Sequence, residues 1–465
     1  MLATPPALSP VLEAGFLPAA LWNRDYRDLV ARDRGARPFV LTLLRPDGTA
    51  LRHESRVLAA DHPSARQTLR YAERLLKFLL WQQGGSRVLV SGADEIAVAL
   101  GLTFAPGGER AFDFDFMGEK IYREPFQIKA ASVEHLPEPR ESSRPLGRHL
   151  KGCRIGFDLG GSLRKVAAVA DGQVMFSEET RWDPYFQADP AYHLAGVQES
   201  LEHAAAHLPR VDAIGGSAAG VYVNNEVRVA SLFRGVSAER FERDVQRMFF
   251  KLREKWGGIP FEVANDGEVT ALAGSMALGE GAVLGISMGT SQAGGYVGPS
   301  GEITSWLNEL AFAPVDYALD APLDEWSRDV GCGAQYFSQQ AVPRLAARAG
   351  FAFPPGIAAS DQLFAVQDAL ARDDRRASDV FASIGRCFGY AIAHYADFYA
   401  LRHVLALGGV TAGVGGEIIL DEARAVLRGA FPALADAVQL HTADEKNKRH
   451  GQAIAAASLP ALGQD

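Results

Sequence analysis

Cysteine is scarce in this sequence, and its scarcity limits the kinds of protein that the chain can be. Only three of the 465 residues are cysteines, at positions 153, 332 and 387, an odd number without the spacing of a disulfide framework. Long apolar runs are also absent, because no stretch of 18 or more apolar residues occurs. Residues 1–16 lack the basic region and apolar block of a secretion signal. We therefore expect a soluble, cytoplasmic protein with no membrane partner.

Positive charge is in deficit as well. The chain has 47 Lys and Arg against 56 Asp and Glu, a net charge of -9. Nucleic-acid-binding domains gather basic residues on one face, so no nucleic-acid partner is expected. The hydrophobic content of 48% and the charged content of 22% are typical of globular proteins. At about 150 residues per domain, the length suggests roughly three structural units.

The chain is expected to open with an accessory α+β domain over residues 1–134. It shows a hairpin around Asp47-Gly48, a helix over Arg66–Gln83 and a strand at residues 87–92. This order echoes the start of the next unit, which is compatible with a degenerate copy or with chance similarity. Apolar and acidic residues alternate over Phe112–Phe116, and the alternation predicts a half-buried strand.

The rest of the chain reads as an α/β architecture with two similar halves. Residues 135–150, rich in Pro, Ser and charge, are interpreted as a linker. Apolar runs separated by glycine turns predict a β-meander at the start of each half, followed by helices. We expect one lobe over residues 151–277 and another over 278–447, with a closing helix over 448–459 that returns to the first lobe.

The first of four notable motifs is Phe-Asp-Leu-Gly-Gly-Ser at residues 157–162. We expect an apolar strand that ends at Asp158, followed by a tight turn that Gly160 and Gly161 allow. Backbone N–H groups in such a turn can bind phosphate oxygens, and Asp158 could hold Mg²⁺ through water. An ordinary β-hairpin with an exposed Asp explains this short motif, taken alone, more simply.

The other three motifs have plain structural explanations too. Gly-Thr-Ser-Gln-Ala-Gly-Gly, at residues 289–295, lies between two apolar runs and fits a hairpin. Leu-Ala-Leu-Gly-Gly-Val, at residues 405–410, fits a strand-to-helix turn. Asn265 and Asp266 precede a helical pattern, where Asp266 could act as an N-cap.

Taken together and in this order, the four motifs resemble the acetate and sugar kinase, heat-shock chaperone and actin superfamily. Within it, Asn265-Asp266-Gly267 followed by the Gly-Thr turn resembles the ROK family of sugar kinases and sugar-responsive repressors, as does the closing segment 441–459. The resemblance covers roughly residues 153–459. It implies two RNase H-like, actin-like ATPase lobes around a nucleotide cleft, with ATP and Mg²⁺ as cofactors and a sugar as the substrate.

The resemblance also implies a role for individual residues. Asp266 corresponds to the catalytic base of the family, which would take a proton from a sugar hydroxyl. The other corresponding residues are Asn265, Glu309, Gly220 and Ser231 for the sugar, Gly160, Gly161, Ser162, Lys165, Gly289, Thr290 and Ser291 for the phosphates, Gly408 and Gly409 for the nucleotide, and Asp158 for Mg²⁺ through water.

Several positions depart from the family pattern. Phe312 stands where the family has a zinc-binding histidine, and Cys332 is the one cysteine left of the usual cluster. One thiol cannot form a tetrahedral zinc site, so no structural zinc is expected and Cys332 should be a small buried residue. Ser231 stands where the family usually has Asn. The basic residue of the first phosphate turn is Arg164 or Lys165, and solvated surface charge explains both equally well.

Three functions fit these observations. The first is an ATP-dependent carbohydrate kinase. The second is a ROK-type sugar-binding or regulatory protein, catalytically weak or inactive; a DNA-binding one would need a helix-turn-helix, yet the helix expected over Ala19–Arg32 runs into a strand with no recognition helix after it. The third is an assembly protein that uses the fold as a nucleotide-gated hinge. The sequence favours the kinase, and a homodimer is compatible with it.

Overall fold

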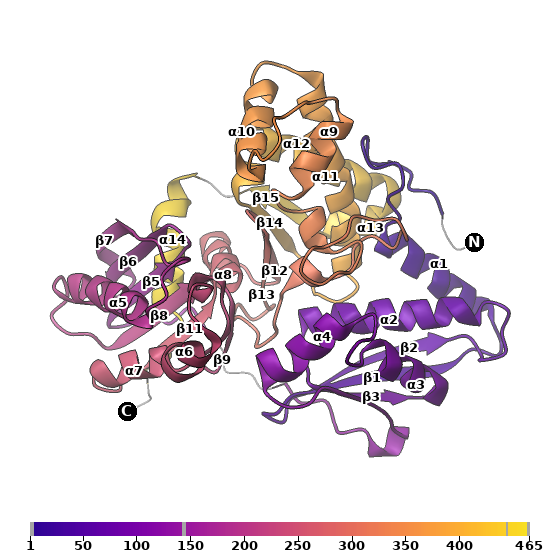
Figure 1. Ribbon diagram of the computed structural model, residues 1–465, viewed down its shortest axis with the longest axis horizontal. Coiled ribbons are helices and arrows are strands. Elements are labelled where there is room, and N and C mark those ends of the chain that lie inside the picture. Colours follow the sequence, from indigo (N-terminus) through magenta and orange to yellow (C-terminus); the bar gives the residue numbers. More distant parts are fainter. Residues whose placement is uncertain (1–3, 142–145, 443–444, 463–465) are drawn as a thin grey trace.

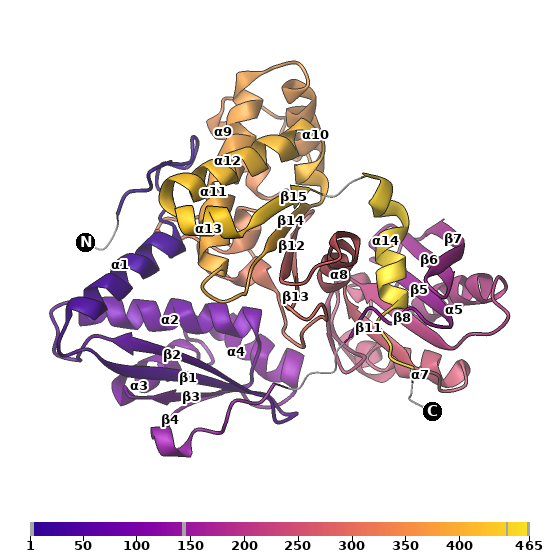
Figure 2. The ribbon, with the colours of Figure 1, turned by 180° about the vertical axis from the view of Figure 1, so that it is seen from behind.

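The computed structural model describes residues 4–141, 146–442 and 445–462. Figure 1 shows three parts: an N-terminal unit, a first lobe that carries α14 on its sheet, and a second lobe rich in helices. The reverse view in Figure 2 shows the N-terminal unit beside the second lobe, with α1 and α2 nearest to it. Of the expected linker, residues 142–145 lie outside the described residues. No helix in the described part of the chain is both long enough and apolar enough to cross a membrane.

The N-terminal unit is built on a four-stranded sheet with the order β2-β1-β3-β4. Its elements are α1 (Ala19–Arg32), β1 (Arg37–Leu44), β2 (Ala50–Val57), α2 (Ala65–Gln82), β3 (Arg87–Ser91), α3 (Asp94–Thr103), α4 (Ala111–Asp115), the π-helical turn η1 (Phe116–Tyr122), β4 (Gln127–Ala130) and the 3₁₀ turn η2 (Val133–His135). Strand β1 pairs antiparallel with both β2 and β3. In the first lobe the first strand, residues 153–159, instead pairs in parallel with the strand over residues 213–218. Because this pairing differs from that of β1 with β3, the N-terminal unit is not a copy of the first lobe.

The strand predicted over Phe112–Phe116 is wrong, because these residues form α4 and the start of η1. Phenylalanine occurs at every second position from Phe112 to Phe116, so Phe112 and Phe116 are four residues apart. Residues four apart lie on the same face of a helix. The rings of Phe112 and Phe116 lie 4.2 Å apart and both pack near Trp81. The Asp113 side chain, on another face, is fully buried and binds Lys77.

The first lobe has a five-stranded sheet with the order β11-β8-β5-β6-β7. Its elements are β5 (Cys153–Leu159), β6 (Leu163–Ala170), β7 (Gln173–Arg181), α5 (Pro190–Ala205), β8 (Ala213–Ala218), β9 (Val221–Val223), β10 (Glu226–Val229), η3 (Ser231–Phe233), α6 (Ala238–Arg240), η4 (Phe241–Val245), α7 (Met248–Lys255) and β11 (Phe261–Asn265). Strands β5, β6 and β7 form the antiparallel meander, and β8 and β11 extend it in parallel.

The closing helix α14 (Glu445–Ala457) lies on the sheet of the first lobe (Figure 1). Two glycines on adjacent strands make this close approach possible. A methyl group added at Gly156 would clash with the carbonyl oxygen of Ala453, and one at Gly215 would clash with that of Ala456. The chain therefore leaves the first lobe after β11 and comes back to it at its C-terminal end.

The second lobe has a four-stranded sheet with the order β13-β12-β14-β15, in which β12 and β13 are antiparallel and β12, β14 and β15 are parallel. Its elements, with the helix that leads into it, are α8 (Asp266–Leu278), β12 (Val283–Met288), β13 (Gln292–Val297), η5 (Leu310–Phe312), η6 (Gly333–Gln335), α9 (Ala341–Arg348), α10 (Ala359–Leu370), α11 (Arg375–Tyr395), β14 (His403–Leu407), η7 (Gly409–Thr411), α12 (Val414–Ala430), α13 (Pro432–Ala437) and β15 (Gln439–Thr442). Helix α11 ends at Tyr395, so the segment up to Leu401 lies outside it.

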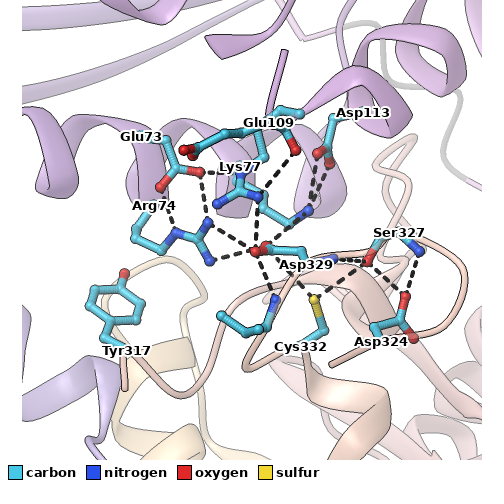
Figure 3. A network of polar contacts seen from close by, with 12 residues as sticks. Glu73, Arg74, Lys77, Glu109, Asp113, Tyr317, Asp324, Ser327, Asp329 and Cys332 are labelled. Atoms are coloured by element: carbon cyan, nitrogen blue, oxygen red, sulfur yellow. Dashed lines mark hydrogen bonds and ion pairs between the residues drawn. The ribbon is translucent and has the colours of Figure 1, made fainter. Parts of the chain in front are cut away.

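A buried ion network joins the N-terminal unit to the second lobe (Figure 3). The Lys77 ammonium on α2 lies 3.0 Å from both carboxylate oxygens of Asp113 and 3.3 Å from Asp329 of the second lobe. All three side chains are at most 2% exposed. Arg74 and Arg110 also bind Asp329, at 3.0 and 2.9 Å. Because charges this deep are stable only when paired, the network ties the two parts together.

Candidate active site

Asp266 begins α8 immediately after β11, and the residue before it fixes the entry to the helix. The Gly267 N–H donates to the Asn265 side-chain oxygen at 2.8 Å, so Asn265 is the N-cap. The Asn265 side-chain amide donates in turn to the Gly220 carbonyl oxygen at 2.7 Å. One amide therefore links the start of α8 to the loop that follows β8.

Glycines bring the start of α8 against β13. A methyl group at Gly295 would come within 2.1 Å of the Gly267 carbonyl oxygen, and one at Gly267 within 2.4 Å of the Gly294 carbonyl oxygen. A methyl group at Gly294 would clash with the Asn308 carbonyl oxygen. Close packing thus explains Gly294 and Gly295 without any phosphate, and its effect is to hold Asp266 beside the segment that carries Glu309.

Three carboxyl groups influence one another here. Burial, and then the charge of Asp158, raise the pKa of Asp266 to about 6. Burial, and then the charge of Asp266, raise the pKa of Glu309 to about 7. Asp266 is thus coupled electrostatically to an acid of the first lobe and to one of the second, and its raised pKa is closer to neutral pH, where a general base is most effective.

Asp158 lies at the end of β5, where the Ser217 hydroxyl donates to it at 2.7 Å and the Lys165 ammonium lies 3.9 Å away. Burial raises the pKa of Asp158, although the hydroxyl and the ammonium oppose the effect. The neighbouring Arg164 points elsewhere: its guanidinium binds the Gly196 carbonyl oxygen and the Ser200 hydroxyl on α5. Arg164 is therefore a buried structural residue, not a solvated surface charge, and Lys165 is the basic residue near Asp158.

The first glycine turn connects β5 and β6. The Gly160 N–H closes it by donating to the Leu163 carbonyl oxygen at 2.9 Å, and Ser162 is exposed at its tip. A methyl group at Gly161 would overlap the Tyr185 side chain. Packing by Tyr185 is thus sufficient reason for a glycine at position 161, while the rest of the turn stays open to solvent.

The second glycine turn and the nucleotide turn lie next to each other in the second lobe. The Gly289 N–H donates to the Ser291 carbonyl oxygen, and Thr290 lies between them at the end of β12. Strand β14 pairs with β12 and ends just before Gly408, whose φ of 94° favours glycine. A side chain at Gly408 would clash with the backbone of Met288, so the two turns share one corner of the sheet. The Gly409 carbonyl oxygen accepts a hydrogen bond from Gln367.

Glu309 is held by the N-terminal unit. The Asn308 N–H donates to the Gln82 carbonyl oxygen and the Glu309 N–H to that of Trp81, both at 2.9 Å, at the C-terminal end of α2. Ser231, in contrast, is exposed at the start of η3, and its side chain makes no hydrogen bond to any described residue. Glu309 is thus positioned by α2 and is influenced by the charge of Asp266, whereas Ser231 shows no such link to Asp266.

At the positions that correspond to the family's zinc site, Phe312 packs against aromatic rings of the N-terminal unit, and Cys332 contacts side chains of the second lobe. The Phe312 ring lies 4.5 Å from that of Trp81 and 5.1 Å from that of Phe112. Cys332 is buried between Asp329 and Ser327, and burial raises the pKa of its thiol to about 12. Among the described residues, no three or more His, Cys, Asp or Glu side chains gather so as to hold a metal ion.

Sequence reasoning missed Glu268, one helical turn after Asn265. The residue is 9% exposed, and burial raises its pKa to about 8, an effect that the nearby Asn308 side chain and Asn265 backbone only partly oppose. It sits where a capping-box Glu is expected, three residues after the N-cap. The spacing of Asn265 and Glu268 could be recognised in the sequence, but the burial of Glu268 could not.

Comparison with solved structures identifies the fold. No protein-family model and no curated protein sequence matches the chain. The ROK hexokinase of Thermus thermophilus superposes with a TM-score of 0.52 and 19% identity, covering 66% of this chain and 97% of that one. Two thirds of this chain has the ROK fold. A ROK transcriptional regulator, a homologue of the E. coli MLC protein, matches with a TM-score of 0.50 and 20% identity over 67% of this chain and 79% of its own.

A proposed N-acetylmannosamine kinase from Listeria monocytogenes also has the ROK fold, with a TM-score of 0.50 and 16% identity over 66% of this chain and 97% of its own. These matches confirm the predicted ROK-like, actin-like ATPase architecture and the presence of a further region outside it. At such identities the likeness concerns the fold alone. Because both kinases and a regulator share the ROK fold, the activity of this chain must be argued from its own residues.

Proposed function

We propose that the protein is an ATP-dependent carbohydrate kinase that phosphorylates a hydroxyl group of a hexose or a related sugar. The observation that carries the proposal is the placement of Asp266 at the start of α8, with its pKa raised to about 6 and with Asp158 and Glu309 as its charged neighbours. Asn265 is the N-cap of the helix, and the Asp266 carboxylate, which also accepts the Gly267 N–H at 3.0 Å, is not needed for that role.

Asp266 acts as the general base. Its carboxylate accepts the proton of the attacking sugar hydroxyl while the hydroxyl oxygen forms a bond to the γ-phosphorus of ATP. The bond between that phosphorus and the β–γ bridging oxygen breaks, and ADP leaves with the bond electrons. Asn265 and Glu309 supply an amide and a carboxyl group for neighbouring sugar hydroxyls, and Gly220 allows the sugar to approach the backbone.

The donor set near Asp158 fits Mg²⁺. This ion is usually bound through one or two carboxylates, with water and substrate phosphates as its other ligands, so it needs no cage of protein groups. Asp158 offers one carboxylate at a strand end, beside the exposed turn that contains Gly160 and Ser162. When bound, the ion would neutralise charge on the phosphates, and Asp158 would hold it through water.

The glycine turns fit the nucleotide. Turn residues Gly160, Gly161 and Ser162 face the phosphates from the first lobe, and Gly289, Thr290 and Ser291 from the second. Gly408 and Gly409 leave room for the nucleoside at the shared corner, and Lys165 adds positive charge on the first lobe. We place this ATP-consuming activity in the cytoplasm. A homodimer would be compatible with it.

A coupled assay of ATP turnover against a panel of hexoses, hexosamines and their N-acetyl forms tests the proposal. Wild type should turn over ATP with at least one sugar, and Asp266→Asn should lose at least about a hundredfold in kcat, as expected when a general base is removed. Asp361→Asn, at an exposed position on α10, is the matched control and should behave as wild type. Thermal stabilisation by a sugar without turnover would instead assign a non-catalytic sugar-binding or regulatory function.

A further inference from the structure

A cavity of about 600 Å³ opens where the N-terminal unit meets both lobes. The N-terminal unit contributes Arg45 and Tyr122 to its wall, the first lobe contributes the β9–β10 hairpin, and the second contributes the segment that contains Trp306. Helix η1 of the N-terminal unit packs directly against β10. Residues that lie outside the ROK fold therefore build part of the cavity.

The cavity shares its wall with the candidate sugar site. Asn265 and Gly220 line it, and they are joined by the 2.7 Å hydrogen bond between the Asn265 amide and the Gly220 carbonyl oxygen. Tyr222 lines it too, and the charge of Asp266, after burial, contributes to raising the pKa of Tyr222. A molecule in the cavity would thus lie beside the residues proposed to hold the reacting sugar.

The wall is rigidly held. The Arg45 guanidinium, which is 4% exposed, donates to the Ser305 carbonyl oxygen at 2.8 Å and to the Gln83 carbonyl oxygen. The Trp306 indole is stacked on Tyr296, with ring centres 5.7 Å apart, and donates to Glu141 at 2.7 Å. Such fixed groups are typical of a preformed pocket that binds a small molecule.

The chemistry of the wall suits a carbohydrate. Aromatic rings of Trp306 and Tyr122 offer flat apolar surfaces, and the amides of Asn224 and Asn265 offer paired donors and acceptors. Glu268, whose pKa burial raises to about 8, adds a carboxyl group that can donate a hydrogen bond when it is protonated. A sugar ring presents an apolar face and hydroxyl groups that both donate and accept, so it can use all three kinds of group.

We propose that the cavity binds a second sugar ring, so that this kinase prefers a disaccharide or a glycoside to a free hexose as its acceptor. The volume is in the range that encloses ligands of drug size, which exceeds the need of one hexose ring. The proposal rests on the proposed function for its reacting ring, but the binding of the second ring can be measured without turnover.

Isothermal titration calorimetry with the full chain tests the proposal. Maltose, cellobiose, lactose and N,N′-diacetylchitobiose are compared with glucose, galactose and N-acetylglucosamine. At least one disaccharide should bind about tenfold or more tightly than its monosaccharide unit, and Trp306→Ala should weaken that binding about tenfold while leaving the monosaccharide affinity within about twofold. Trp306→Phe should restore most of the affinity. Trp326→Ala, at a position that is 65% exposed and outside the cavity, is the matched control.

The outcomes separate this proposal from the kinase proposal. If no disaccharide binds more tightly than its monosaccharide, or if binding is insensitive to Trp306→Ala, the second-ring site is refuted whatever the kinase assay shows. If disaccharide binding depends on Trp306 but no sugar is phosphorylated, the site stands and the kinase activity is refuted. Where turnover exists, Trp306→Ala should raise KM for the disaccharide and leave kcat within about twofold.

Discussion

Replacing Lys77 by Met should destabilise the protein strongly, because it leaves a buried carboxylate without its cation. Lys77 is 0% exposed, and its ammonium is the cation bound to both oxygens of Asp113, at 3.0 Å. Burial lowers the pKa of Lys77, but the charges of Asp113 and Asp329 outweigh it and raise that pKa above the usual value. Asp329 keeps Arg74 and Arg110 as partners after the substitution, whereas among the described residues Asp113 keeps only the Trp81 indole N–H.

Removing one partner of a buried ion pair costs about 3–5 kcal/mol. Urea unfolding followed by tryptophan fluorescence should therefore show a midpoint lower by on the order of 1 M, given typical slopes for unfolding in urea. The double variant Lys77→Met with Asp113→Asn should recover at least half of the loss, because the carboxylate is removed as well. Lys120→Met, at an exposed position of the same unit, is the matched control. A Lys77→Met cost no larger than that of Lys120→Met would refute the reasoning.

Three further predictions concern the site. The pH profile of kcat/KM should rise with increasing pH to a plateau, with an apparent pKa near 6 and not near 4. The reason is that Asp266 must lose its proton to act as a base, and its pKa is raised to about 6. An apparent pKa near 4 would contradict this raised pKa. Gly295→Ala should lower both the melting temperature and kcat, since a methyl group there meets the Gly267 carbonyl oxygen and displaces the start of α8; unchanged values of both would disprove this packing. Asn265→Ala should cost about 1 kcal/mol of stability through loss of the N-cap, whereas Asn265→Ser should keep most of the stability but still raise the KM for sugar, as measured by thermal unfolding and steady-state kinetics.

The fold of the two lobes could be predicted from the sequence because its signals are local. Apolar runs separated by glycine turns indicated the strands on either side of Gly160 and Gly289, and the structure has them. The error at Phe112–Phe116 arose because alternation with a period of two also places apolar residues four apart. The choice between helix and strand here depends on a long-range contact, because Asp113 is buried against Lys77. The residues near Asp113 in the sequence do not indicate that contact.

The candidate site was only partly predictable. Asn265 and Asp266 stand between an apolar strand and a helical pattern, so their place at a helix start followed from the sequence. The contribution of the N-terminal unit to the cavity could not be predicted. Its residues Arg45 and Tyr122 are far apart in the sequence from each other and from Trp306 of the second lobe, with which they line the cavity. Likewise, whether Arg164 or Lys165 serves the site depended on the direction of each side chain, which only the structure supplies.

A crystal structure with a non-hydrolysable ATP analogue, Mg²⁺ and the best acceptor tests the central claim most directly. The account predicts a sugar hydroxyl within about 2.6–3.2 Å of an Asp266 carboxylate oxygen, with the terminal phosphate between the turns at Gly160 and Gly289. An acceptor whose hydroxyl groups all lie beyond hydrogen-bonding reach of Asp266, or an analogue bound away from both turns, would contradict it.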